Sequence, residues 1–382
     1  MANMIPGWKD KALFTPGPLT TSRTVKGAML QDLGSRDEAF ISVVRDIRRR
    51  LLAIAETGPE YVAIPMQGSG TFGIEAVLAT SVPRDGAVLT IINGAYGRRI
   101  AHMCDVMGIR HVDAEFPENT LPELNVIASI LNRHDGITHV AIVHCETTTG
   151  IVNPIDRIGE MLRDRDVTYF VDAMSSFGAI PIDFEGWGID YLVSSANKCI
   201  EGVPGFSFVI ARRKKLLTTE GLARSLSLDL FSQWKGLETN GQFRFTPPTH
   251  ALLAFHQALI ELEAEGGVAG RSARYRHNYE VLLSGMAALG FETYLPQELQ
   301  GYIITSFRYL EHDNFDFDAF YQRLNKKGYV IYPGKVSDAA CFRVGNIGRL
   351  FESDMRDLLA AVRSTLLELN IELRRGNEEV SM

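Results

Sequence analysis

The chain has 382 residues, of which 46% are hydrophobic and 22% charged, and its formal net charge is −7 at pH 7. These values are typical of a soluble globular protein with two or more compact units, which buries most of its apolar surface without disulfides or metals. The negative charge argues against a general nucleic-acid binder, because phosphate contacts require clustered Lys and Arg.

The N-terminal segment MANMIPGWKD lacks the apolar stretch of a signal peptide. No later apolar run approaches the roughly eighteen residues that a membrane helix needs. We therefore expect a cytoplasmic protein that has no membrane partner.

Seven apolar, β-branched segments predict strands, at 61–66, 87–92, 110–114, 138–144, 167–172, 190–195 and 206–211. Such near-continuous hydrophobic strands are typical of a mostly parallel sheet that is covered on both faces. Segments with apolar residues three and four apart predict helices between them, at 95–107, 121–131 and 154–163. The alternation indicates an α/β domain with right-handed crossovers. Only ten residues separate the last two strands, so we expect that pair to be antiparallel and the sheet to be mixed at one edge.

The pattern changes after residue 212. A loop-rich stretch leads into a predicted helix at 249–264, which Gly266 and Gly267 close. From about residue 272, long helical segments frame shorter strands at 302–307, 329–332 and 340–344. This part predicts a smaller α+β domain with a polar, frayed tail at 374–382.

A glycine-rich turn, QGSGTFG (67–73), follows the first strand and begins a helix. It satisfies the G-x-G-x-x-G pattern of dinucleotide-binding proteins, but the next predicted strand ends in Asn93-Gly94 and lacks the acid that would hold a ribose. The turn has a simpler physical interpretation, in which backbone N–H groups at a helix N-terminus bind a phosphate, helped by Ser69 and Thr71. A tight strand-to-helix turn with a Ser cap is the alternative.

Asp172 ends the fifth predicted strand, where open parallel sheets place their ligands. Burial would raise the pKa of its carboxyl unless a cation lies opposite, and a protonated pyridine nitrogen is such a cation. A helix cap explains Asp172 equally well when it is considered alone.

Lys198 follows the next strand, in YLVSSANK (191–198), and precedes a tight Gly-Val-Pro-Gly loop. Lysine is almost never buried without a partner, and desolvation lowers the pKa of its amine so that the neutral form can attack an aldehyde. An Asp that ends one strand and a Lys that ends the next, 26 residues later, is far more specific than either residue alone.

The chain resembles the class-V (fold type I) aminotransferases, a family that depends on pyridoxal 5′-phosphate (PLP). The resemblance is carried, in order along the chain, by LFTPGPLTTSRTVK (13–26), QGSGTFGIEAVL (67–78), NGAYG (93–97), HCETTTGIVNPID (144–156), VDAMSSFGAIPID (171–183), SSANKCIEGVPGFSFVIAR (194–212), RSLSLDL (224–230), RFTPPTH (244–250), IYPGKVS (331–337) and CFRVGNIG (341–348). It implies a large PLP-binding domain at 20–265 with a seven-stranded, mostly parallel sheet. Residues 1–19 and 266–382 would form the small domain.

The resemblance also implies roles for individual residues. Lys198 would hold PLP as a Schiff base and move protons, and Asp172 would pair with the ring nitrogen. Ser69, Gly70 and Thr71 would bind the phosphate, and Thr246 would reach it from the partner subunit of a homodimer with shared active sites. The remaining residues would contact the ring or the substrate: Tyr96 by stacking, Thr148 through the phenolic oxygen, Arg343 at the anionic end of the substrate, and Gly17 in the rigid turn 15–18.

The closest resemblance is to a branch of the family that moves the amino group of 2-aminoethylphosphonate to pyruvate. A transaminase for another small donor, of the serine or alanine–glyoxylate type, is one alternative, and a PLP-dependent aminophosphonate lyase is another. Arg36 is a second candidate for the phosphonate, against a solvated helix cap.

Cysteine desulfurases share this fold but need a thiol on a mobile loop, whereas Cys341 lies in a strand-like segment. The other cysteines, Cys104, Cys145 and Cys199, show no C-x-x-C or zinc-finger spacing, so we expect no metal site. We expect His144 and Cys145 to fill the core.

Overall fold

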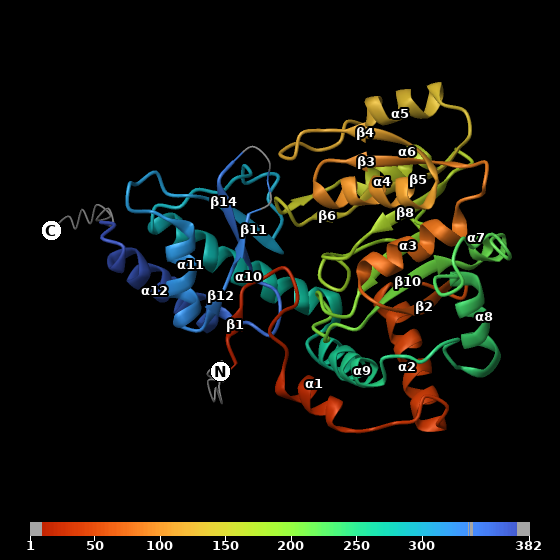
Figure 1. Cartoon of the computed structure of the whole chain (residues 1–382), viewed down its shortest axis with the longest axis horizontal. Helices are drawn as coiled ribbons and strands as arrows, with labels where there is room; N and C mark the ends of the chain where they lie inside the picture. The colour runs from red at the N-terminus through yellow and green to blue at the C-terminus, as the bar shows by residue number, and fades with distance from the viewer. Residues whose placement is uncertain (1–9, 335, 337–338, 373–382) are drawn as a thin grey trace.

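The computed structural model describes residues 10–334, 336 and 339–372. Its largest sheet has seven strands in the order β2-β10-β9-β8-β5-β3-β4 (Figure 1). The bounds are β2 (Tyr61–Gln67), β3 (Ala87–Ile92), β4 (Arg110–Glu115), β5 (Ile137–Val143), β8 (Thr168–Asp172), β9 (Tyr191–Ser195) and β10 (Phe206–Arg212). Every one of the seven predicted strands is confirmed, with ends that agree to within one residue.

Strand β10 is the one antiparallel strand of this sheet, and it pairs with both β9 and β2. The predicted antiparallel pair and the mixed pairing at one side of the sheet are therefore confirmed, although β10 is not itself the edge strand. The edge strand is β2, which precedes the others along the chain and pairs with β10 across a long sequence separation. Spacing along the chain reveals the direction of neighbouring strands, whereas it carries no information about such a distant partner.

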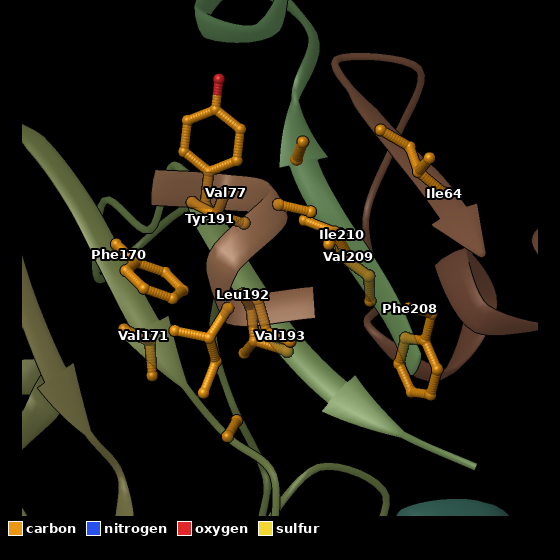
Figure 2. Packing of buried hydrophobic residues seen from close by; sticks show 14 of the residues in the cluster. Ile64, Val77, Phe170, Val171, Tyr191, Leu192, Val193, Phe208, Val209 and Ile210 are labelled. Carbon is orange, nitrogen blue, oxygen red and sulfur yellow. The ribbon is translucent and has the colours of Figure 1, made fainter. Parts of the chain in front are cut away.

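Helices pack against the sheet and complete an α/β domain. Their bounds are α2 (Glu38–Ile54), α3 (Gly70–Ser81), α4 (Ala95–Met107), α5 (Leu124–Arg133), α6 (Ile155–Leu162), α8 (Leu230–Asn240) and α9 (Thr249–Ala264), with short helices α1 (Arg23–Gly27), η1 (Ala28–Leu30) and α7 (Arg213–Leu217). Figure 2 shows Val77 of α3 among apolar side chains of β8, β9 and β10, including Phe170 and Val193. This dry core fixes the strands whose ends carry the predicted site.

A second hydrophobic cluster joins Phe14 to apolar residues between Leu282 and Ile371. It lies among β11 (Ile304–Arg308), β13 (Tyr332–Pro333), β14 (Cys341–Gly345), α10 (Gly267–Ala288), α11 (Phe317–Lys326) and α12 (Glu352–Glu368), while β1 (Ala12–Leu13) pairs with β12 (Tyr329–Val330). The predicted strand 329–332 is thus split between two sheets, and the helix expected from about 272 begins at Gly267. The two cores support a division near residue 265, which stays a prediction.

Because β5, β8 and β9 are parallel, their carboxyl ends lie on the same side of the large sheet. Strand β2 runs in the same direction, so its carboxyl end lies on that side as well. The last residues of these strands and the segments that follow them include the glycine-rich turn, Asp172 and Lys198. In the part of the chain that the structure describes, no helix combines the length and apolarity needed to cross a bilayer. The tail 374–382 lies outside the described residues.

Candidate active site

Lys198 lies in a tight turn that begins directly after β9. The backbone N–H of Glu201 donates to the Lys198 carbonyl at 2.7 Å, and Gly202 N–H donates to Ala196 O at 2.9 Å. The Lys198 Nζ donates to the carbonyl of Pro16 at 2.5 Å. Burial lowers the pKa of the Lys198 amine, although Tyr96 and other nearby groups oppose that effect. A lowered pKa increases the fraction of neutral amine, the form that acts as a nucleophile.

The turn at 15–18 comes so close to Lys198 that it must contain a glycine. Gly17 has φ +111°, and a Cβ there would lie 2.9 Å from Lys198 Cδ and 3.1 Å from its Nζ. The closeness of Gly17 to the Lys198 amine is a finding of the structure that the sequence did not predict. A role for this turn in substrate binding stays a prediction.

Asp172 ends β8 and is almost completely buried. Burial raises the pKa of its carboxyl to about 6, against the lowering effects of the Met174 N–H, Lys198 and Arg99. The Met174 N–H donates to Oδ1 at 2.9 Å. A buried carboxyl with so few donors is suited to a cationic partner such as a protonated ring nitrogen.

The glycine-rich turn begins α3 at the carboxyl end of β2, with Ser69 as the N-cap. The Ser69 side chain makes no capping bond, and the first N–H groups of a helix have no acceptor within the helix. Gly68 N–H donates to Gly205 O at 3.2 Å, so this turn is bonded to the loop that follows Lys198. The exposed N-terminus of α3, with Gly70 and Thr71 in its first turn, has the geometry of a phosphate site.

Arg343 on β14 reaches from the second core into the same region. Only 2% of it is exposed. Its Nε donates to Pro333 O at 3.0 Å and its Nη1 to Thr147 O at 2.9 Å. Burial lowers the pKa of the Arg343 guanidinium, while a side-chain hydrogen bond with Tyr96 favours the charged form. No carboxylate is bonded to this buried cation in the described chain, and an anionic ligand would compensate its charge.

Tyr96 and Thr148 lie near Arg343, from two other segments. Tyr96 is in the first turn of α4, and the guanidinium of Arg99 lies 4.7 Å from the centre of its ring. Thr148 is fully buried, and its backbone carbonyl accepts from Ser306 Oγ at 2.9 Å. The structure thus brings Tyr96, Thr148 and Arg343 together, while their contacts with a cofactor stay predictions.

Thr246 lies in the segment that follows α8 and is exposed. Gln67 Nε2 donates to its carbonyl at 2.9 Å, which holds the segment beside the glycine-rich turn of the same chain. Thr246 and Arg36 line one polar cavity of about 320 Å³. A group donated across a subunit interface must be exposed in a single chain, and Thr246 meets that condition.

Two features near the site were not predicted from the sequence. Glu146 is completely buried between α4 and Thr148, and the Pro16 carbonyl binds the Lys198 amine. Glu146 lies within the segment HCETTTGIVNPID, for which the family resemblance implies a role at Thr148 and none at Glu146. The signal that could have found it is a carboxylate directly after an apolar strand, next to the strand that ends in Asp172. A backbone carbonyl has no sequence signal.

A buried ionic cluster supports the Lys198 turn from α10. Glu201 accepts from Tyr275 Oη at 2.6 Å and from Arg274 Nη2 at 2.7 Å, and Arg271 Nη1 lies 3.4 Å from the same carboxylate. Arg271 also donates to the carbonyl of Cys199, the residue after Lys198. These bonds fix the backbone that carries the amine.

His144 and the four cysteines are buried. Cys104, Cys145, Cys199 and Cys341 are free buried thiols, and Cys341 lies within β14. His144 is buried beside Cys145. The described residues contain no group of three or more His, Cys, Asp or Glu that could hold a metal ion.

The described residues fit pyridoxal phosphate. A partly buried amine with a lowered pKa suits an aldehyde, and a buried carboxyl suits a pyridinium nitrogen. The uncapped N-terminus of α3 suits a phosphate. Buried Arg343 suits the anionic end of a substrate.

Comparisons with known proteins agree with this arrangement. A family model described as aminotransferase class-V matches residues 21–339. The chain is 51% identical over 355 residues to a 2-aminoethylphosphonate–pyruvate transaminase of Syntrophobacter fumaroxidans, which covers 93% of this chain and 96% of that protein. It is 52% identical over 360 residues to a protein of the same name from Salmonella paratyphi C, with 94% and 98% covered. The crystal structure of a ureidoglycine–glyoxylate aminotransferase from Bacillus subtilis matches with a TM-score of 0.88 at 23% identity, covering 96% of each chain.

Proposed function

The chain belongs to the class-V aminotransferase family, and from this premise we propose that it is a PLP-dependent transaminase of 2-aminoethylphosphonate and pyruvate. Relatives with that name share about half of their residues with it over nearly the whole chain. The observation that carries the proposal is that Lys198 and Asp172 lie at the carboxyl ends of the neighbouring strands β9 and β8, where burial lowers the pKa of the amine and raises that of the carboxyl.

In this proposal, residues of this chain and of a second subunit would hold five parts of the cofactor. Lys198 binds its aldehyde carbon, and Asp172 binds its ring nitrogen. Ser69, Gly70 and Thr71 bind its phosphate with α3 N–H groups, and Thr246 of a second subunit completes that site. Tyr96 covers the ring, and Thr148 contacts the phenolic oxygen. Bound PLP supplies an electron sink for the negative charge that develops on the substrate carbon.

Lys198 and Asp172 have distinct chemical tasks. The neutral Nζ of Lys198 accepts a proton from the carbon that carries the amino group of the donor. The carboxylate of Asp172 keeps a proton on the ring nitrogen by charge pairing. The net reaction converts 2-aminoethylphosphonate and pyruvate into phosphonoacetaldehyde and L-alanine.

Arg343 binds the anionic end of both substrates in turn. Its Nε and Nη1 are held by the carbonyls of Pro333 and Thr147, which fixes the plane of the guanidinium. A planar fork suits either the phosphonate of the donor or the carboxylate of pyruvate. Gly17 lines the same pocket, and Arg36 is the second candidate for the phosphonate.

The test is a panel of amino donors assayed with pyruvate and scored by alanine formation. We expect 2-aminoethylphosphonate to be preferred over alanine, serine and related donors. A preference for serine, or for alanine with glyoxylate, would instead indicate the other branch of the family. Omitting pyruvate distinguishes a transaminase from an ammonia-releasing lyase, since only a lyase turns over without it. Lys198→Ala serves as the control and should lose both turnover and the visible absorbance of bound PLP.

A further inference from the structure

The carboxyl group of Glu146 is completely buried and accepts four hydrogen bonds. Its Oε2 accepts from the backbone N–H groups of Tyr96 at 3.1 Å and Gly97 at 3.3 Å. Its Oε1 accepts from the N–H of Thr148 at 3.4 Å and from Thr148 Oγ1 at 3.0 Å. One carboxyl group therefore connects the N-terminus of α4 to the loop that carries Thr148.

The space for this carboxyl depends on the absence of a side chain at Gly94. A Cβ on Gly94 would lie 2.2 Å from Glu146 Cγ and 2.4 Å from its Cδ. The φ of Gly94 is 173°, which is extended backbone that any residue adopts. Gly94 is thus required for space alone, and Glu146 has little freedom to move.

The surroundings of Glu146 include several charged and titratable groups. Arg343 on β14 interacts with its charge, and Tyr96 lies on α4. Cys145 lies beside Glu146, and the charges of Lys198 and Asp172 affect the pKa of its thiol. The carboxyl is therefore surrounded by groups that the proposed function assigns to the cofactor and the substrate.

The hydroxyl of Thr148 has one proton to donate. An ionised Glu146 can only accept hydrogen bonds. Thr148 Oγ1 therefore donates its hydrogen bond to the carboxylate, and only its lone pairs remain for the group bound in the site. A protonated Glu146 could donate to Thr148 Oγ1 and leave the hydroxyl proton free for another acceptor. Burial raises the pKa of Glu146 to about 7, so both states are accessible near neutral pH.

We propose that Glu146 is a positioning residue. It determines whether the Thr148 hydroxyl donates a hydrogen bond to the group bound in this site or accepts one from it. The inference rests on the proposed function, in which that group is the phenolic oxygen of PLP. When Glu146 is ionised, its negative charge favours protonation of the bound cofactor. The hydrogen bond from Thr148 Oγ1 to the carboxylate has the same effect, because the hydroxyl then donates no bond to the phenolic oxygen. When Glu146 is neutral, the Thr148 proton stabilises the phenolate oxygen and the cofactor loses its proton more easily.

The experiment is a pH titration of the visible absorbance of the holoenzyme. Glu146→Gln keeps the shape and can donate an amide proton to Thr148 Oγ1, which imitates the protonated acid. We expect it to lower the midpoint of the titration by about one pH unit. In a Thr148→Val background the same change should shift the midpoint much less. Glu115→Gln, at an exposed position that ends β4, is the matched control and should leave the midpoint unchanged.

An unchanged midpoint in Glu146→Gln would overturn the inference, and so would an equal shift in the Thr148→Val background, since charge alone would then explain it. If Glu146→Gln does not fold, Thr148→Ser and Thr148→Val provide the test: serine should keep the wild-type midpoint and valine should change it. Identical midpoints for these two would also overturn the inference. A wild-type protein without a PLP absorbance band would refute the proposed function, which separates the two failures.

Discussion

The amine of Lys198 is positioned by two backbone features, the carbonyl of Pro16 and the missing Cβ of Gly17. Neither feature belongs to a side chain that reacts. Both come from the N-terminal segment, far from Lys198 in the sequence. The geometry of the amine that we propose to bind the cofactor therefore depends on a turn that lies outside the segment around Lys198.

Gly17→Ala should impair catalysis while leaving the protein folded. The new methyl group would overlap Lys198 Cδ and displace the Nζ, and a displacement near 1 Å commonly reduces turnover by about 100-fold. Steady-state kcat/KM and circular dichroism provide the measurements. Gly328→Ala is the matched control, because Gly328 has φ +96° but nothing within 4 Å of its Cβ position. Equal losses in the two variants would show that backbone strain alone is responsible.

Arg343→Ala should raise KM for both 2-aminoethylphosphonate and pyruvate. The loss of a buried, hydrogen-bonded cation at an anion site weakens binding by about 2–5 kcal/mol. Separate KM measurements for each substrate check this, and Arg308→Ala on the neighbouring strand β11 is the control because Arg308 is exposed. If only one substrate is affected, one cation does not serve both, and Arg36 becomes the candidate for the other.

At the scale of elements, α10 stabilises the turn that carries Lys198. Glu201 is 3% exposed, and its ionic partners on α10 are Arg271 and Arg274. Removing one partner of a buried ion pair leaves an uncompensated charge. The cluster thus joins the reactive turn to the helix that follows the predicted domain boundary.

Glu201→Gln should lower the free energy of unfolding by about 3 kcal/mol, because Arg271 and Arg274 would lose the more deeply buried of their two carboxylate partners and keep only Glu265. Urea denaturation measures the effect. Glu352→Gln removes an exposed carboxylate that pairs with His277 and Arg356, and it should have no measurable effect. Similar stabilities for the two variants would argue against an energetic role for the buried cluster.

Most elements of the large sheet could be predicted because its strands, apart from the largely exposed edge strand β4, are apolar runs that are buried on both faces. The positions of Asp172 and Lys198 at the carboxyl ends of neighbouring strands could also be predicted, since a charged residue there is unusual, while their roles stay predictions. The pairing of β2 with β10 could not, because it depends on contacts between distant segments. The same holds for Pro16 and Glu146, which act through a backbone carbonyl and through neighbours that only the folded chain brings together.

For the whole molecule, the proposal that Thr246 acts across a dimer interface can be tested with hybrid dimers. Lys198→Ala and Thr246→Glu should each be inactive, the latter because a carboxylate would repel the phosphate. Mixing the two unfolded variants and refolding them together should restore about a quarter of the wild-type activity if the site is shared between subunits. Mixtures that stay inactive would indicate that each subunit forms its own site. Refolded wild-type protein is the control.

Buried histidines should make the molecule sensitive to acid. Burial lowers the pKa of His139 to about 3, so the unfolded state binds a proton below about pH 6.5 that the folded state does not. Stability from this group is therefore present above pH 6.5 and decreases as the pH falls. In His139→Phe, the loss of unfolding free energy between pH 6.5 and 5 should be smaller by about 2 kcal/mol. Urea denaturation at each pH tests this, and exposed His102→Gln should follow the wild type.

The position of β10 between β2 and β9 has a consequence for protein synthesis. The glycine-rich turn follows β2, whose place in the sheet depends on a strand that the ribosome makes much later. A nascent chain that already contains Asp172 and Lys198 still lacks the strand that aligns the turn with them. Cofactor capture is therefore expected only after β10 has left the ribosomal exit tunnel, so the glycine-rich turn has no ligand to stabilise it while the segments between β2 and β10 are made.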